Sequence, residues 1–251
     1  SERMPGVRSV ALGFWVLAGS CDEPPDISGS SHFLEHLLFK GTSSRSAQDI
    51  AEAFDAVGGN LNAYTAKETT VFHARILDRD LPMAVAHLAD MFRDSTLRPA
   101  DLEAERQVIL EEINMYEDAP DELVHDLFQE TLWPDHPLGR PILGTKQTVD
   151  ALTSDGLRQY FEGVYTAPNL IVAVVGNIEH DHVRALIERA FADLPRVSAP
   201  VHETPPRAVS HTTIRTKDLE QSHVCLGASG YRQNHDDRYG CYVLNTILGG
   251  S

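Results

Sequence analysis

The run of residues 30–40 constrains this chain more than any other part of its sequence. A helix formed there is apolar on nearly every side, through Phe33, Leu34, Leu37, Leu38 and Phe39. Such a helix is buried rather than solvated. The same run carries His32, Glu35 and His36, and residues three and four apart share one helix face. Because buried ionisable groups need partners, a cation held between the two imidazoles is the simplest explanation of this face.

The order His-x-x-Glu-His also indicates a reaction. Two imidazoles one turn apart can hold a divalent cation while Glu35 reaches a water molecule on that cation. This order inverts the better-known His-Glu-x-x-His and predicts metal-assisted hydrolysis of a peptide bond. A chain with 12 histidines can produce so short a pattern by chance. The buried flanks favour the metal site over that alternative.

A site with two histidines needs a third protein ligand, commonly a carboxylate. Residues 99–116 are expected to form a helix, with Pro99 in its first turn. Apolar residues follow at helical spacing: Leu102, Val108, Ile109, Ile113 and Tyr116. Glu105 and Glu112 lie two turns apart, on the same side as Val108 and Ile109. Carboxylates on a core-facing side are unusual, so both are candidates, with partial burial at a helix edge as the alternative.

Composition limits the partners and the compartment. The formal net charge of −16 disfavours nucleic acid and anionic membrane surfaces, because both are polyanions. The cysteines are odd in number and form no C-x-x-C pair, which favours a reducing, cytoplasmic compartment: Cys21, Cys225 and Cys241. No apolar run approaches the length of a membrane span. No targeting segment is visible at Ser1, but Ser1 is not a natural start, so a leader could have been removed ahead of it.

The predicted strands and helices are grouped rather than strictly alternating, which favours an α+β fold. Strands are expected over residues 7–18, 60–64, 69–77 and 170–176. Besides the motif helix, helices are expected over residues 46–57, 80–93, 99–116, 121–132, 154–164 and 180–194.

The end of the chain contains an internal repeat. A proline-rich stretch, residues 195–206, reads as an extended linker. Beyond it, residues 224–227 echo residues 10–13, and residues 239–250 align with residues 30–41. The second copy lacks the metal-site residues, whose places are taken by Cys241, Leu244 and Asn245.

These motifs together resemble the pitrilysin or inverzincin metallopeptidases, which include mitochondrial processing peptidase and insulin-degrading enzyme. Residues 32–42 are similar to the motif of the processing-peptidase type at almost every position. Residues 58–65, followed by Glu68-Thr69-Thr70, resemble a second family block, and residues 105–113 a third. The blocks cover most of residues 5–195. The chain is therefore identified as a bacterial member of the processing-peptidase-like type.

The resemblance implies roles for individual residues. His32, His36 and Glu112 would hold one Zn²⁺ per chain, because the family spacing from the second histidine selects Glu112. Glu35 would be the catalytic base. Glu105 would be an accessory catalytic carboxylate near the metal rather than a ligand.

The resemblance also implies two lobes built on a mostly antiparallel sheet with helices packed on it. Residues 1–195 would be the metal-binding catalytic lobe, 196–210 the linker, and 211–251 the start of a second, homologous lobe that breaks off at Ser251. That start would contain the opening strand of the second lobe, at residues 224–227, and its opening helix, at residues 239–250. In such proteins the two lobes enclose a chamber around the metal site. Closing that chamber would require the rest of the second lobe, a partner subunit or a second copy of the chain. We expect the 251 residues alone to bind zinc but to cleave peptides poorly.

The function that this resemblance implies is a zinc-dependent endopeptidase acting on extended peptides or small unfolded proteins through a metal-activated water. Substrate would add as a strand to an exposed sheet edge, for which the best candidate residues are Asn60, Leu61, Asn62 and Ala63. One alternative is a non-catalytic or partner-dependent subunit or scaffold, and another is a metal-binding module without hydrolysis. The retained ligands argue against the first and the intact Glu35 against the second.

Overall fold

The structure, a computed structural model, describes residues 1–197 and 205–249. Its sheet has the strand order β1-β5-β2-β4-β3. The strands are β1 (Glu2–Arg3), β2 (Ser9–Val16), β3 (Asn60–Thr65), β4 (Thr70–Leu77) and β5 (Leu170–Gly176). Neighbouring strands are antiparallel except β1 and β5, which are parallel. The expected α+β fold with a mostly antiparallel sheet is confirmed.

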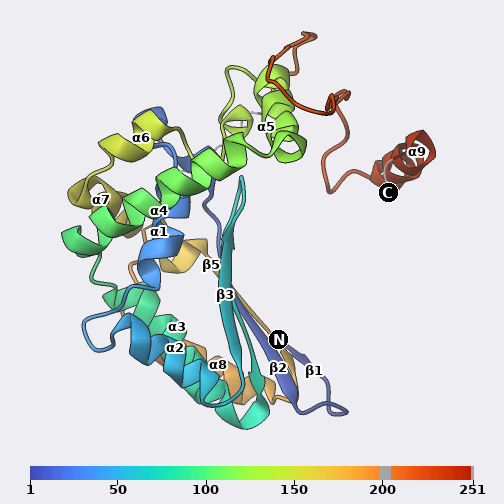
Figure 1. Cartoon of the computed structure of the whole chain (residues 1–251). Helices are drawn as coiled ribbons and strands as arrows, with labels where there is room; N and C mark the ends of the chain where they lie inside the picture. Colours follow the sequence, from blue (N-terminus) through green and yellow to red (C-terminus); the bar gives the residue numbers. More distant parts are fainter. Residues whose placement is uncertain (198–204, 250–251) are drawn as a thin grey trace.

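Helices α1 to α4 and α6 to α8 lie on one side of the sheet in Figure 1. The helices are α1 (Ser30–Leu38), α2 (Ala47–Asp55), α3 (Leu81–Asp94), α4 (Pro99–Glu117), α5 (Pro120–Leu132), α6 (Lys146–Ala151), α7 (Ser154–Val164), α8 (His180–Ala190) and α9 (Arg238–Leu248). Short 3₁₀ turns are η1 (Ser20–Asp22), η2 (Pro25–Ile27), η3 (Asp78–Asp80), η4 (Pro137–Gly139) and η5 (Ala167–Asn169). No helix of the described residues has both the length and the apolar character needed to cross a bilayer.

The core lies between the sheet and the helices that cover it. Alternate residues of β2 point into this core and are almost fully buried: Val10, Leu12, Phe14 and Val16. The ring of Phe14 packs against Phe92 of α3 and Phe191 at the end of α8, with ring centroids 5.7 and 5.4 Å apart. Burial on one face explains why the apolar pattern of residues 7–18 was sufficient to predict this strand.

The motif helix α1 is fixed at its N-terminus by a buried carboxylate. Glu23 accepts hydrogen bonds from the backbone N–H groups of Gly29 (2.7 Å) and Ser31 (2.6 Å). These N–H groups have no partner within the helix, so Glu23 replaces the missing side-chain cap. Gly29 has a φ of 99°, and a Cβ there would lie 2.7 Å from the carbonyl oxygen of Leu143. The start of α1 therefore depends on glycine at this position.

Helix α4 is anchored against α1 and α6. The guanidinium of Arg106 donates to the carbonyl oxygens of Val149 and Leu152, the latter at 2.8 Å. Glu105 and Ile109 of α4 are buried, whereas Val108, which we expected on the same side, is 50% exposed. That prediction was wrong because consecutive helix residues are about 100° apart, and α4 buries only the narrower side that carries Ile109.

The segment after residue 204 follows the expected repeat only in part. Residues 205–227 run along α5, where the N–H of Val209 donates to the carbonyl oxygen of Leu132 at 3.0 Å. Residues 224–227 form no strand, although we expected one from the repeat. A strand needs a neighbour for its backbone groups, and no described strand pairs with this segment. Helix α9 does form, without a buried residue, and lies apart from the other helices in Figure 1.

Three of our expectations fall partly outside the described residues. The predicted linker, residues 196–210, includes residues 198–204, and the aligned segment 239–250 includes Gly250. The predicted start of the second lobe, residues 211–251, includes Gly250 and Ser251.

Candidate metal centre

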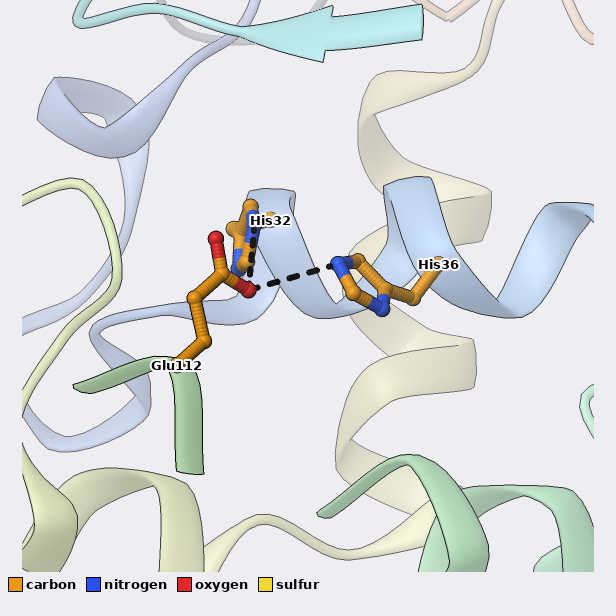
Figure 2. A group of neighbouring side chains, drawn as sticks. All are labelled: His32, His36 and Glu112. Atoms are coloured by element: carbon orange, nitrogen blue, oxygen red, sulfur yellow. Dashed lines mark ion pairs between the residues drawn. The ribbon is translucent and has the colours of Figure 1, made fainter. Parts of the chain in front are cut away.

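Two helices bring together three side chains that could hold a metal ion. His32 and His36 project from α1, and Glu112 projects from α4 toward both (Figure 2). The Oε2 atom of Glu112 lies 3.6 Å from Nε2 of His32 and 3.7 Å from Nε2 of His36. The imidazole rings are 4.7 Å apart between centroids. Residues 80 positions apart in the sequence thus meet because α4 packs across α1.

The protonation of His32 fits a metal ligand rather than an ion pair. Burial, reinforced by the neighbouring His36, lowers the pKa of His32 to about 3. Its imidazole is therefore neutral at pH 7, with one ring nitrogen free to donate a lone pair. The buried Nδ1 of His32 has no hydrogen-bond partner in the part of the chain that the structure describes.

The spacing of the three donor atoms also fits a small cation. At 3.6 and 3.7 Å, the contacts between Glu112 and the imidazoles are too long for ordinary hydrogen bonds. In tetrahedral zinc coordination at roughly 2.0–2.1 Å, adjacent ligand atoms lie about 3.3 Å apart. Two imidazole nitrogens and one carboxylate oxygen are a ligand set typical of catalytic zinc, so the residues present fit this ion.

Glu35 lies beside the three donor residues. Its Oε2 accepts a hydrogen bond of 2.6 Å from the Thr65 hydroxyl at the end of β3. Burial raises the pKa of Glu35, and the Thr65 hydrogen bond opposes that shift. His32, Glu35 and Glu112 line one open cleft of about 330 Å³. The rest of its lining comes from β3, α4, α5 and the loop after residue 140, through Tyr64, Thr65, Tyr116, Glu122, Asp126, Ile142 and Leu143.

Glu105 is placed behind the donor cluster rather than in it. Its Oε2 lies 3.0 Å from Nδ1 of His36, the ring nitrogen turned away from Glu112 in Figure 2. Its Oε1 lies 2.6 Å from the ammonium of Lys40. The Glu105 side chain is 9% exposed, whereas that of Glu112 is 43% exposed. The two candidate carboxylates of α4 thus lie in different surroundings.

The predicted substrate strand lies at the edge of the sheet. Among the strands of residues 1–197 and 205–249, β3 pairs with β4 alone, and its last residues, Tyr64 and Thr65, reach the cleft. The N–H of Ala66 donates to the carbonyl oxygen of Thr69 across the turn between β3 and β4. Amides alternate in direction along an antiparallel strand, so the N–H groups of Tyr64 and Asn62 also face β4. The amide of Ala63 faces outward, where the side-chain oxygen of Asn62 accepts its hydrogen bond.

Several residues around the centre were not predicted from the sequence. Thr65, Lys40 and the α5 carboxylates Glu122 and Asp126 were not singled out. The position of Lys40, four residues after His36, was a usable signal because it places both side chains on one helix face. No local signal marks Thr65, whose contact with Glu35 depends on how β3 lies against α1.

Comparison with known proteins fits this geometry. Residues 1–146 match Insulinase (Peptidase family M16), and residues 151–251 match the Peptidase M16 inactive domain. The chain belongs to peptidase family M16. The resemblance to pitrilysin-type metallopeptidases is thereby confirmed, and the candidate metal centre lies within the first of the two M16 matches.

Relatives of this M16 chain include bacterial proteins named as zinc proteases. The uncharacterized zinc protease YmxG of Bacillus subtilis is 44% identical over 250 residues, which cover all of this chain and 61% of YmxG. A protease from Helicobacter pylori has a similar fold, with a TM-score of 0.74 and 25% identity over 79% of this chain and 48% of its own.

The periplasmic protease PqqL from Escherichia coli also has a TM-score of 0.74, with 26% identity over 82% of this chain and 24% of its own. The M16 chain described here thus spans less than two thirds of the length of these relatives.

Proposed function

We propose that this chain is the metal-binding part of a zinc-dependent M16 endopeptidase. The observation that carries the proposal is the convergence of His32, His36 and Glu112 beside a cleft that His32, Glu35 and Glu112 line. The first three would hold one zinc ion per chain, and Glu35 would be the catalytic base. A non-catalytic subunit would have no need for this complete set.

We assign each residue of the centre a separate role in peptide hydrolysis. His32, His36 and Glu112 would hold a zinc ion, which would supply Lewis acidity toward a water molecule and the substrate carbonyl. Glu35 takes a proton from the attacking water and returns it to the leaving amine. The Thr65 hydroxyl holds Oε2 of Glu35, which leaves its other oxygen to make this transfer. Glu105 orients His36 from behind the centre.

The substrates we propose are extended peptides or small unfolded proteins. A peptide adding to the outer edge of β3 at Asn60, Leu61, Asn62 and Ala63 would run toward the cleft through Tyr64 and Thr65. Glu122 and Asp126 line the same cleft, and their carboxyl groups would favour a basic side chain near the bond to be cleaved.

For the whole protein we propose two lobes. Residues 1–195 would be the catalytic lobe, 196–210 a linker and 211–251 the start of a second lobe. The match of residues 151–251 to the inactive M16 domain supports a second, non-catalytic part. The chamber around the metal site would be closed by the rest of the second lobe, by a partner subunit or by a second copy of the chain. The compartment we propose is the cytoplasm, as the free thiols of Cys21, Cys225 and Cys241 favour.

The experiment that tests this function measures zinc and cleavage together. The zinc content of the purified 251-residue chain should be close to one ion per chain. An internally quenched peptide containing arginine should be cleaved, a chelator should abolish the cleavage, and added zinc should restore it.

The same measurements separate the alternatives. Zinc without cleavage, in this chain and in a full-length relative such as YmxG, would make the protein a metal-binding module or a scaffold. Absence of bound zinc would contradict the metal centre itself.

A further inference from the structure

Lys40 has no part in the proposed chemistry, yet it contacts the residue that orients a ligand. It lies just beyond the end of α1, and its N–H donates to the carbonyl oxygen of Leu37 at 3.0 Å, which continues the helical turn. Its ammonium lies 2.6 Å from Oε1 of Glu105. The side chain of Lys40 is 36% exposed, so this cation reaches from the surface to a buried carboxylate.

The two oxygens of Glu105 have different partners. Oε1 faces Lys40, and Oε2 lies 3.0 Å from Nδ1 of His36. In a neutral imidazole one ring nitrogen donates and the other accepts. If Nδ1 of His36 donates to Glu105, the lone pair is left on Nε2, the nitrogen that faces Glu112 at 3.7 Å. The carboxylate thus decides which nitrogen of His36 is available to a metal ion.

His32 has no such support. Its Nδ1 is buried without a hydrogen-bond partner in residues 1–197 and 205–249. Within those residues, the ion pairs of Glu105 are the ones with Lys40 and His36. Of the two imidazoles, His36 is therefore the one that the described residues support from outside the centre, through contacts that run from Lys40 to Glu105 and on to His36.

We propose that Lys40 is a positioning residue of the metal centre. It holds the Glu105 carboxylate in the rotation that presents Oε2 to His36 and supplies the positive charge that a buried carboxylate needs. The inference rests on the proposed zinc site and extends it by one residue.

Two roles of Lys40 predict effects of opposite sign on zinc affinity. If Lys40 acts only through its charge, its removal strengthens zinc binding, because like charges repel. If it acts through Glu105, its removal weakens zinc binding, because the carboxylate no longer fixes the ring of His36. The sign of the change therefore distinguishes positioning from simple electrostatics.

The experiment measures the zinc dissociation constant of the 251-residue chain by competition with a chelator. Lys40→Met should weaken binding about tenfold, the lower end of the usual effect of groups that support a ligand. Lys40→Arg should restore most of the affinity, since it keeps the charge and the reach. Lys40→Gln serves as a second variant should Lys40→Met fail to fold. Lys146→Met is the matched control, because Lys146 also pairs with a glutamate, Glu117, at 2.7 Å but away from the centre.

A double-mutant cycle with Glu105→Gln completes the test. In that background Lys40→Met should cost no further affinity, and the visible spectrum of the Co²⁺-loaded chain should change in Lys40→Met but not in Lys146→Met. Equal or tighter zinc binding by Lys40→Met and Lys40→Gln, or the same loss with and without Glu105, would overturn the inference. Failure of the unmodified chain to bind zinc would instead contradict the proposed function.

Discussion

At the scale of single residues, the centre uses two histidines in different ways. His32 is held by burial, which lowers its pKa to about 3 and keeps the imidazole neutral. His36 is held by a hydrogen bond between its Nδ1 and Oε2 of Glu105, 3.0 Å apart, on the side of the ring away from Glu112 (Figure 2). Glu112 is the most exposed of the three donors, with 43% of its side chain accessible. The three donors therefore lie in different surroundings, and single substitutions should separate their contributions.

Removing any one of the three donors should remove stoichiometric zinc. Glu112→Ala leaves two imidazoles, which bind zinc weakly, and His32→Ala or His36→Ala leaves one imidazole and one carboxylate. Glu111→Ala, at the exposed neighbouring position, is the control and should retain zinc. Metal analysis of the purified variants checks this. Full occupancy in Glu112→Ala would move the third-ligand role to another carboxylate of α4.

A substitution of Glu35 should affect catalysis without affecting zinc binding. Glu35→Gln should keep zinc and fold normally but lose most turnover, because an amide cannot accept a proton from water. General-base catalysis contributes roughly 10²–10⁴-fold, so a residual rate above about a tenth would exclude Glu35 as the main base. Peptide cleavage at equal zinc occupancy is the measurement, with Glu111→Gln as the control.

The sequence was sufficient to predict the site residues that are neighbours on a single helix. His32, Glu35 and His36 share one helix face, so helical periodicity alone places them together. Glu112 was distinguished from Glu105 only by the resemblance to a family, because both lie on the same side of α4. The contact of Lys40 with Glu105 depends on how α4 packs against α1, which no local pattern encodes.

At the scale of elements, the position of α1 depends on Glu23. Burial raises the pKa of this carboxyl from its ordinary value of 4.5 to about 7, although two backbone N–H groups donate to it. Between about pH 4.5 and pH 7 the folded chain therefore retains a proton that the unfolded chain has released. The stability that this protonation contributes is present at low pH and is lost as the pH rises through this window.

This leads to a prediction for Glu23→Gln. The unmodified chain should lose up to roughly 3 kcal/mol of unfolding free energy across the window through this group, whereas Glu23→Gln should lack that contribution. Urea denaturation at about pH 5 and about pH 7 measures the difference, and Glu130→Gln, at an exposed position of α5, is the control. Parallel pH profiles of the Glu23→Gln variant and the unmodified chain would contradict the assignment.

The edge strand β3 allows a test of substrate docking. Ala63→Pro removes an outward-facing N–H and should raise KM for peptides while leaving zinc in place, because proline donates no hydrogen bond. Asn62→Pro is the matched comparison, since it removes an N–H that faces β4 and should lower stability instead. Unchanged KM and kcat in Ala63→Pro would mean that substrate docks elsewhere.

Elements that depend on distant partners were predicted less well. The six-residue helix α6 was not predicted, although Thr145 and Thr148 form a capping box at its start. A strand was expected at residues 224–227, where Val224 and Leu226 are in fact 85% and 95% exposed. Apolar β-forming residues do not make a strand without a neighbouring strand.

At the scale of the whole molecule, the curated relatives are longer than this chain, which spans 61% of YmxG. An open cleft lets water compete for the hydrogen bonds of a peptide, and the positioning contribution to catalysis is then reduced. We expect full-length YmxG to cleave a peptide faster than the 251-residue chain at equal zinc occupancy. A parallel assay compares them, and equal specific activity would show that the 251-residue chain is self-sufficient.

The anchoring of α4 by Arg106 has a consequence for calorimetry. Because the backbone carbonyls of Val149 and Leu152 hold this helix, the donors of α1 and α4 face each other before any ion arrives. Zinc that folds a disordered peptide buries much apolar surface and so has a large negative heat-capacity change. Here little surface would be buried on binding, and titration at several temperatures should give a nearly constant enthalpy.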